Sequence, residues 1–142
     1  MQDKFSVSDL FHIDRIKKIF LSSEGRINRF EYFKRLLASL VILVLSLIIG
    51  IVFVFGCVFA GLVEAAETLA YVVSVFVFIP SIVVQYHLDV QRLHDLNKGN
   101  TLAIVRIVSA IIWIPAIIIG IYLLFFKGTT GSNDYGPDPL EH

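Results

Sequence analysis

The chain has 142 residues, of which 56% are hydrophobic and 17% are charged, and its twelve Lys and Arg residues balance twelve Asp and Glu residues. Soluble domains of this size rarely carry so much apolar surface with so few charges, so a membrane protein is expected. The single cysteine, Cys57, excludes an internal disulfide and a cysteine-based zinc site.

The first 35 residues are polar and contain no short apolar core followed by a small-residue cleavage site, so we expect no removable signal peptide. Apolar residues in this segment recur at helical spacing beside Asp14, Lys17 and Lys18, at positions Leu10, Ile13, Ile16 and Phe20. This spacing predicts an amphipathic helix on the cytoplasmic surface of the membrane. The alternative is a helix that packs against other cytoplasmic segments.

The next helix start is marked by Asn28 and Glu31, which have the spacing of a capping box. This pair predicts a helix that begins at Arg29 and enters lipid after Arg35.

Three apolar stretches follow, at about residues 36–63, 68–86 and 102–126. Their lengths are those of membrane-spanning helices, and they lack the alternation of barrel strands. The predicted fold is therefore all-α and polytopic, with three transmembrane helices in one membrane domain over residues 1–139. Residues 140–142, Leu-Glu-His, resemble the beginning of a purification tag.

The distribution of basic residues predicts the orientation. The segment before the first span carries eight of them, whereas the loop at residues 64–67 carries none. The positive-inside rule then places the N-terminus in the cytoplasm. Arg92 and Lys98 are consistent with a cytoplasmic location of the second loop. Three crossings would then place the C-terminus on the opposite side, in the periplasm.

Arginine residues form the first candidate site. Arg92 can pair with Asp95 or Asp89, and Arg26 and Arg29 approach from the same side of the membrane. One interpretation is an anion site for a lipid or substrate phosphate, since a guanidinium offers a planar fork to such oxygens. The other is an Arg–carboxylate network that fixes the first helix against the loop.

Further polar residues are candidates for the same network: Glu31, His94, Asp95, Arg106, Asn133 and Asp134. Arg106 is the only charge inside the three spans, lies near the start of the third one, and is expected to pair with Asp89 or Asp95. Gly and Pro in the tail predict consecutive turns there. If the tail lies on the same side of the membrane as the polar segments before the first span and after the second span, the third stretch must be re-entrant rather than spanning.

His87, Gln91 and His94 share one helix face, a spacing that is compatible with a metal but is more simply explained by ordinary hydrogen bonds. The sequence contains no hydrolase, zinc-protease, phosphate-loop or dinucleotide motif, and no nucleic-acid-binding module. We therefore expect no enzyme activity, metal, cofactor or nucleic-acid partner.

Three polar blocks flank the spans, in the order residues 24–33, 92–95 and 128–139. Their order and sequence resemble domain-of-unknown-function family 805, the YhaH-like bacterial inner membrane proteins, and the dozen residues of the last block are the most specific part. The chain departs from that family's pattern at Phe33, at Gln91 and over residues 98–101. The resemblance implies a location in the inner membrane and supplies no mechanism.

These observations predict a non-enzymatic inner membrane protein that serves as an assembly, envelope-stress or interaction component and contacts anionic lipid through Arg26, Arg29 and Arg92. Its partners would be membrane lipids, other membrane proteins or further copies of the chain. The alternative is a small oligomeric transporter or channel subunit with Arg106 and Asp95 lining a passage.

Overall fold

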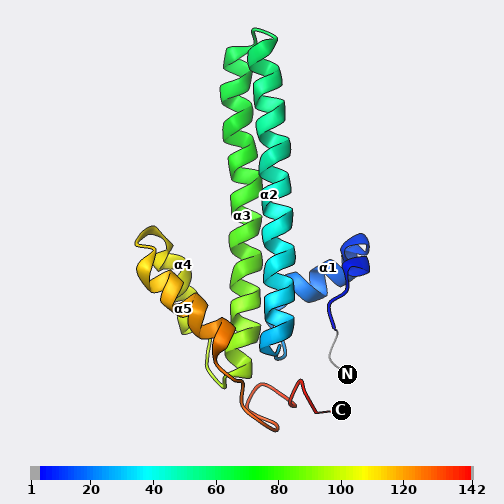
Figure 1. Cartoon of the computed structure of the whole chain (residues 1–142), viewed down its shortest axis with the longest axis vertical. Helices are drawn as coiled ribbons and strands as arrows, with labels where there is room; N and C mark the ends of the chain where they lie inside the picture. The colour runs from blue at the N-terminus through cyan, green and yellow to red at the C-terminus, as the bar shows by residue number, and fades with distance from the viewer. Residues whose placement is uncertain (1–3, 142) are drawn as a thin grey trace. The chain divides into compact units, whose positions relative to one another are not determined.

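The computed structural model describes residues 4–141, and so leaves out the first three residues of the predicted domain and His142 of the predicted tag. Within these residues the regular structure is helical, apart from an isolated bridge between Asn133 and Gly136 (Figure 1). The chain forms two compact units. We call Leu37–Val83 the hairpin unit, and the described residues before and after it the polar unit.

The helices follow each other along the chain with short connections. In order they are η1 (Val7–Phe11), α1 (Ile13–Phe20), α2 (Arg29–Phe59), α3 (Val63–Asp95), α4 (Thr101–Val108), η2 (Ser109–Ile111) and α5 (Ile114–Phe125). The second predicted span, at about residues 68–86, thus lies within a longer continuous helix, α3.

The hairpin unit consists of the adjoining parts of α2 and α3, which lie side by side and are joined by a tight turn (Figure 1). Gly61 has a φ of 75°, and the amides of Gly61 and Leu62 donate to the carbonyls of Val58 and Cys57 at 3.0 and 2.9 Å. This Schellman motif ends α2 and reverses the chain. Glycine is favoured at this left-handed position because it has no Cβ atom.

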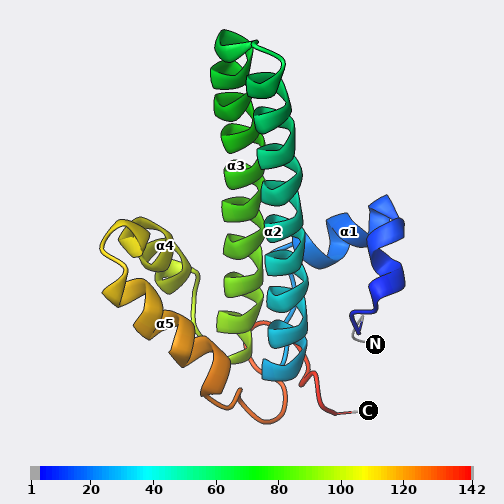
Figure 2. The ribbon, with the colours of Figure 1, turned by 45° about the horizontal axis from the view of Figure 1, so that its top comes forward.

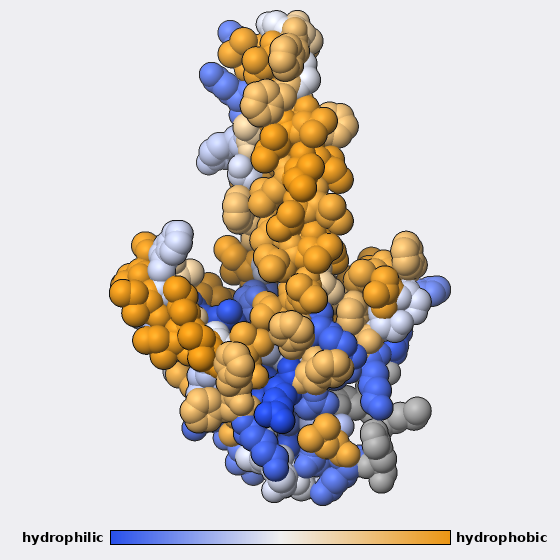
Figure 3. Space-filling model, viewed as in Figure 1, coloured by the Kyte–Doolittle hydropathy of each residue, from blue (hydrophilic) through white to orange (hydrophobic). Residues whose placement is uncertain are grey.

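Helix contact inside the hairpin unit depends on Gly50, where a Cβ atom would collide with the side chain of Val73. The outer faces carry exposed apolar side chains (Figure 3). Only 6% of the most apolar window of α2 and none of that of α3 is buried, so these helices are not the core of a soluble domain. They are the two described helices that are long and apolar enough to cross a membrane.

The predicted third spanning helix is wrong. Residues 101–125 form α4, η2 and α5, with Trp113 at a φ of 66° between η2 and α5, and Pro115 in the first turn of α5. At a rise of about 1.5 Å per residue, even α5 measures only about 18 Å, against about 30 Å of bilayer hydrocarbon. α5 folds back against α4, so the stretch is a helical hairpin (Figure 2).

The predicted start of α2 is confirmed, because Asn28 Oδ1 accepts a hydrogen bond from the Glu31 amide at 2.9 Å and the helix begins at Arg29. A helix also forms in the N-terminal segment, where α1 buries Ile19 and Phe20 and leaves Ile13 exposed. Its position on a membrane surface stays a prediction.

Candidate functional site

The C-terminal end of α3 organises the polar unit. Asn97 has a φ of 53°, and the amides of Asn97 and Lys98 donate to the carbonyls of His94 and Leu93 at 3.1 and 2.9 Å. This Schellman motif ends the helix at Asp95, with Asn97 as its left-handed residue. The amide side chain of Asn makes it one of the few non-glycine residues that tolerate this conformation.

Arg92 is completely buried, and its guanidinium holds the end of α5. Its Nε donates to the carbonyl of Leu123 at 2.8 Å, and Nη2 donates to the carbonyl of Phe126. Nη1 forms an ion pair with the Asp95 carboxylate, the partner predicted at i+3. Arg92 therefore satisfies carbonyls that the end of a helix leaves without partners.

Arg26 is also buried and binds the tail in the same way. Its Nη1 donates to the carbonyls of Gly131 and Gly136 at 2.8 and 3.0 Å, and its Nη2 donates to the carbonyl of Thr129 at 2.7 Å. Nη2 also lies 3.2 Å from Asp95 Oδ1. One carboxylate, Asp95, is thus shared by two buried arginines from different polar blocks.

The tail docks directly on the end of α3. The Thr129 amide donates to the Asp95 carbonyl at 2.8 Å, and Asn133 Nδ2 donates to the His94 carbonyl at 2.8 Å. The ring of Tyr135 stacks on His94 with centroids 3.9 Å apart and planes at 7°. Asp134 is exposed, and its amide donates to Asn97 Oδ1 at 3.4 Å.

These contacts contradict the prediction that the tail lies on the opposite side of a membrane from the loop before α2 and the end of α3. Segments joined by hydrogen bonds between Arg26, Asp95 and Thr129 cannot lie on opposite sides of a bilayer. The tail, the end of α3 and the loop before α2 therefore form one composite polar site. The prediction failed because it assumed a third crossing.

A second buried cluster surrounds Asp89. Its Oδ1 accepts hydrogen bonds from Tyr32 Oη at 2.8 Å and Gln85 Nε2 at 2.6 Å, and lies 2.5 Å from Arg106 Nη1. This ion pair confirms that Arg106 has a partner on α3. Within residues 4–141, Asp89 Oδ2 has no hydrogen-bond partner. A Cβ atom at Gly120 would lie 3.3 Å from the Arg106 guanidinium, so α5 approaches this cluster closely.

Glu31 and Arg35 form a third buried group near the start of α2. Glu31 Oε1 lies 2.5 Å from Lys34 Nζ, and Oε2 accepts a hydrogen bond from the Phe5 amide at 2.9 Å. Arg35 Nη1 donates to Gln91 Oε1 at 3.0 Å and to the Ile19 carbonyl at 3.3 Å. Arg35 was not among the predicted network residues, because its charge was interpreted only as a signal of membrane orientation.

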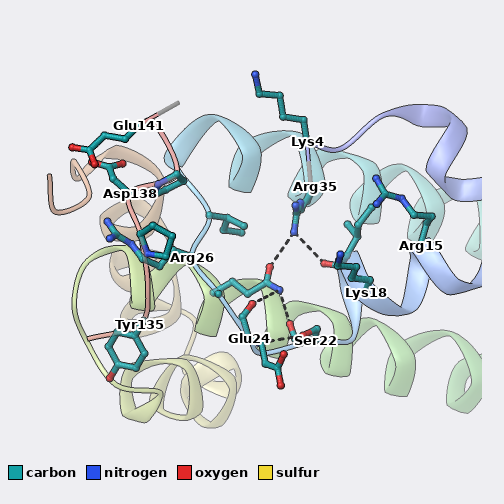
Figure 4. A pocket seen from close by; sticks show the side chains of 16 residues that line it. Lys4, Arg15, Lys18, Ser22, Glu24, Arg26, Arg35, Tyr135, Asp138 and Glu141 are labelled. Carbon is teal, nitrogen blue, oxygen red and sulfur yellow. Dashed lines mark hydrogen bonds between the residues drawn. The ribbon is translucent and has the colours of Figure 1, made fainter. Parts of the chain in front are cut away.

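A pocket of about 1040 Å³ lies beside this group in the polar unit (Figure 4). Its charged lining residues include five bases and three acids, namely Lys4, Arg15, Lys18, Arg26, Arg35, Glu24, Asp138 and Glu141. Hydrogen bonds from the amides of Leu140 and Gly131, each 2.9 Å long, hold the pKa of the Asp138 carboxyl below its usual range.

The three arginines predicted to bind anions differ in exposure. The guanidinium groups of Arg26 and Arg92 are buried and bound to carbonyls and Asp95, as in the predicted arginine–carboxylate network. Arg29 is exposed. In the described part of the chain, no three His, Cys, Asp or Glu residues are grouped so that they could hold a metal ion.

Comparison with known families gives one match. The model of a family described as "Protein of unknown function (DUF805)" matches residues 20–137. No curated protein and no solved structure matches the chain significantly. The match contains the first two polar blocks and the third one as far as residue 137.

Proposed function

The chain belongs to the DUF805 family of proteins of unknown function, and we propose that it is a non-enzymatic component of the bacterial inner membrane that binds anionic lipid at its cytoplasmic face. In this proposal α2 and α3 span the bilayer, and the polar unit lies in the cytoplasm. Its role is that of an assembly, envelope-stress or interaction component.

The distribution of charge supports this orientation. All twelve Lys and Arg residues belong to the segments that make up the polar unit, and the hairpin unit contains none. The turn between α2 and α3 is followed by Glu64 and Glu67, without a basic residue. Because cytoplasmic segments carry the excess of basic residues, both termini are assigned to the cytoplasm.

The observation that carries the lipid proposal is a set of exposed basic residues next to the start of a candidate spanning helix. Lys17 and Lys18 are exposed on α1, and Arg29 is exposed at the first position of α2. Basic residues at the surface of an anionic leaflet contribute about 1 kcal/mol each to binding. Arg26 and Arg92 are buried and contribute to the polar unit that carries this surface, because they hold the tail and the end of α5.

Lipid retention tests the proposal. The protein is purified in micelles that contain phosphatidylglycerol or phosphatidylcholine, and retained lipid is counted by native mass spectrometry. We expect preferential retention of phosphatidylglycerol, and loss of the preference in a variant with Lys17, Lys18 and Arg29 all changed to Gln. The control changes two lysines that are exposed elsewhere, Lys98 and Lys127, to Gln. Equal retention of both lipids by the unaltered protein would contradict the proposal.

A small transporter or channel subunit is the second candidate, and the Asp89 cluster is the observation that favours it. A buried carboxylate with an unpartnered oxygen on a candidate spanning helix is a common feature of ion pathways. Arg106 pairs with Asp89 rather than with Asp95, so the cluster replaces the predicted lining pair. The few helices of one chain enclose too little space for a passage, so this candidate requires an oligomer. A strictly monomeric state in bilayers, measured by photobleaching, would therefore exclude it.

A further inference from the structure

The α4–α5 hairpin, residues 101–125, has polar contacts at its base and an apolar tip. Arg92 of α3 holds the carbonyl of Leu123 near the end of α5. Within α4, η2 and α5, Arg106 is the one charged residue, and it pairs with Asp89 of α3. The polar groups of the hairpin are therefore used to fix it to α3, and its tip carries no charge.

The tip, where η2 meets α5, exposes four large apolar side chains in a row. Ile111 is 88% exposed and Trp113 is 71% exposed, and Ile112 and Ile114 are exposed as well. Apolar side chains continue from the tip along α4 and α5 (Figure 3). A contiguous apolar surface of this kind marks a place where a protein meets a membrane or another molecule.

The tip also satisfies the hydrogen-bond donors of its own turn. The amides of Ile112 and Trp113 donate to the Ser109 carbonyl at 2.9 and 3.1 Å. The Ile114 amide donates to the Ile112 carbonyl at 2.8 Å, and Pro115 after it has no amide hydrogen. The Ser109 hydroxyl donates to a carbonyl of the preceding turn at 3.2 Å. Because hydrocarbon offers no hydrogen-bond partners, a turn with internally paired amides is suited to lipid.

The length of the hairpin matches one leaflet of a bilayer. At a rise of about 1.5 Å per residue, α5 measures about 18 Å, and half of the bilayer hydrocarbon is about 15 Å thick. Exposed lysines lie just outside both ends of the hairpin, Lys98 before α4 and Lys127 after α5. Lysines beside an apolar segment lie at the level of the lipid phosphates, which zwitterionic and anionic lipids share. The base of the hairpin is thus suited to the headgroups and its tip to the acyl chains.

We propose that the α4–α5 hairpin inserts into a single leaflet of the membrane, where phospholipid acyl chains cover its tip. Protein interfaces combine an apolar centre with a polar rim, whereas the charge nearest to this tip, Arg106, is already paired with Asp89. Acyl chains are therefore the occupant that fits the tip. The inference rests on the proposed function, because it assumes that the polar unit lies at the cytoplasmic face. It adds a membrane contact that does not depend on anionic lipid.

Trp113 is the only tryptophan of the chain, so its fluorescence reports on the tip. The full chain is reconstituted in phosphatidylcholine vesicles whose acyl chains carry bromine, a quencher of tryptophan, near the glycerol, at mid-chain or near the methyl end. We expect the largest loss of Trp113 fluorescence with bromine near the methyl end. The matched control combines Trp113→Phe with Phe125→Trp, which moves the reporter to the exposed last residue of α5. In this control, bromine near the glycerol should cause the largest loss.

Three results would overturn the inference. Strongest quenching of Trp113 by bromine near the glycerol would mean that the hairpin lies along the membrane surface. Quenching by iodide in the water, without quenching by brominated lipid, would place the tip in water. Protection from both quenchers would show that protein, such as a second copy of the chain, covers the tip. The proposed function fails separately, because a missing preference for phosphatidylglycerol would refute it without changing the depth of Trp113 in phosphatidylcholine.

Discussion

The amide nitrogen of Thr129 donates a hydrogen bond to the carbonyl oxygen of Asp95 across 2.8 Å. The side chain of the same Asp95 pairs with Arg26 and Arg92. One residue at the end of α3 therefore fixes the tail through its backbone and two other segments through its carboxylate. This relationship makes the three polar blocks one structural unit, and it leads to the following predictions.

Gly128→Ala should detach the tail. A Cβ atom at Gly128 would overlap the Asp95 carboxylate, and no flexible neighbour can move aside without breaking the two arginine contacts. Overpacking of this kind costs about 1–3 kcal/mol. Unfolding in mixed micelles, together with protease cleavage of the tail, measures the effect. Gly99→Ala is the control, because its Cβ would make only an ordinary contact with Tyr135 at 3.8 Å; a similar loss in both variants would contradict the account.

Arg26→Gln should destabilise the polar unit much more than Arg29→Gln. Arg26 donates to three tail carbonyls and pairs with Asp95, whereas Arg29 is exposed. Removing one partner of a buried ion pair costs about 3–5 kcal/mol, and a surface substitution changes stability by about 0.5 kcal/mol or less. The free energy of unfolding in mixed micelles distinguishes the two variants. An Arg26→Gln protein as stable as the unaltered one would refute a structural role for this arginine.

Arg106 and Asp89 should be energetically coupled. Arg106→Met leaves the buried Asp89 carboxylate without its cation, and Asp89→Asn leaves Arg106 without its anion. Arg106→Met is expected to cost about 3–5 kcal/mol, because it strands the buried Asp89 carboxylate, and Asp89→Asn should cost less, because the Arg106 side chain is 19% exposed. The double variant should lose at least about 1 kcal/mol less than the sum of the single variants. A double-mutant cycle on unfolding measures this coupling, and strict additivity would show that the pair does not interact.

Tail docking should weaken in acid. Amide hydrogen bonds from Leu140 and Gly131, with Arg26 and Lys127 nearby, lower the pKa of Asp138 in the folded protein. A carboxyl with a lowered folded pKa stabilises the fold above its unfolded pKa, and this stability is lost as pH falls through the folded value. Protease protection of the tail should therefore decrease below about pH 4. In Asp138→Asn, protection should be weaker at neutral pH and should change less between pH 5 and pH 3; an unchanged acid response would exclude Asp138 as its source.

Local signals in the sequence were sufficient for part of this structure. The start of α2 was predictable because the hydrogen bond from the Glu31 amide to Asn28 needs only residues that are three apart. The partners of Arg92 and Arg106 were among the few carboxylates near them in the sequence. The first feature depends on residue spacing at the start of one helix. The others depend on the small number of carboxylates that are available as partners.

The path of the chain after α3 was not predictable from apolar content. A largely apolar stretch of 25 residues has the same composition whether it crosses a bilayer or folds back. The reversal depends on the left-handed conformation of Trp113, which the residue type Trp does not signal. The burial of Arg35 was missed for a related reason. Its acceptors, the Ile19 carbonyl and Gln91, come from distant segments and form only in the folded unit.

Compartment-specific thiol labelling tests the central claim, a single polar unit on one side of the membrane, most directly. Single cysteines are introduced at the exposed positions Glu67, Lys98 and Ser132 in a Cys57→Ser background and labelled in intact cells and inverted vesicles. We expect positions 98 and 132 to react from the cytoplasm and position 67 to react from the opposite side. Labelling of positions 98 and 132 from opposite sides would restore a third crossing and contradict the composite site.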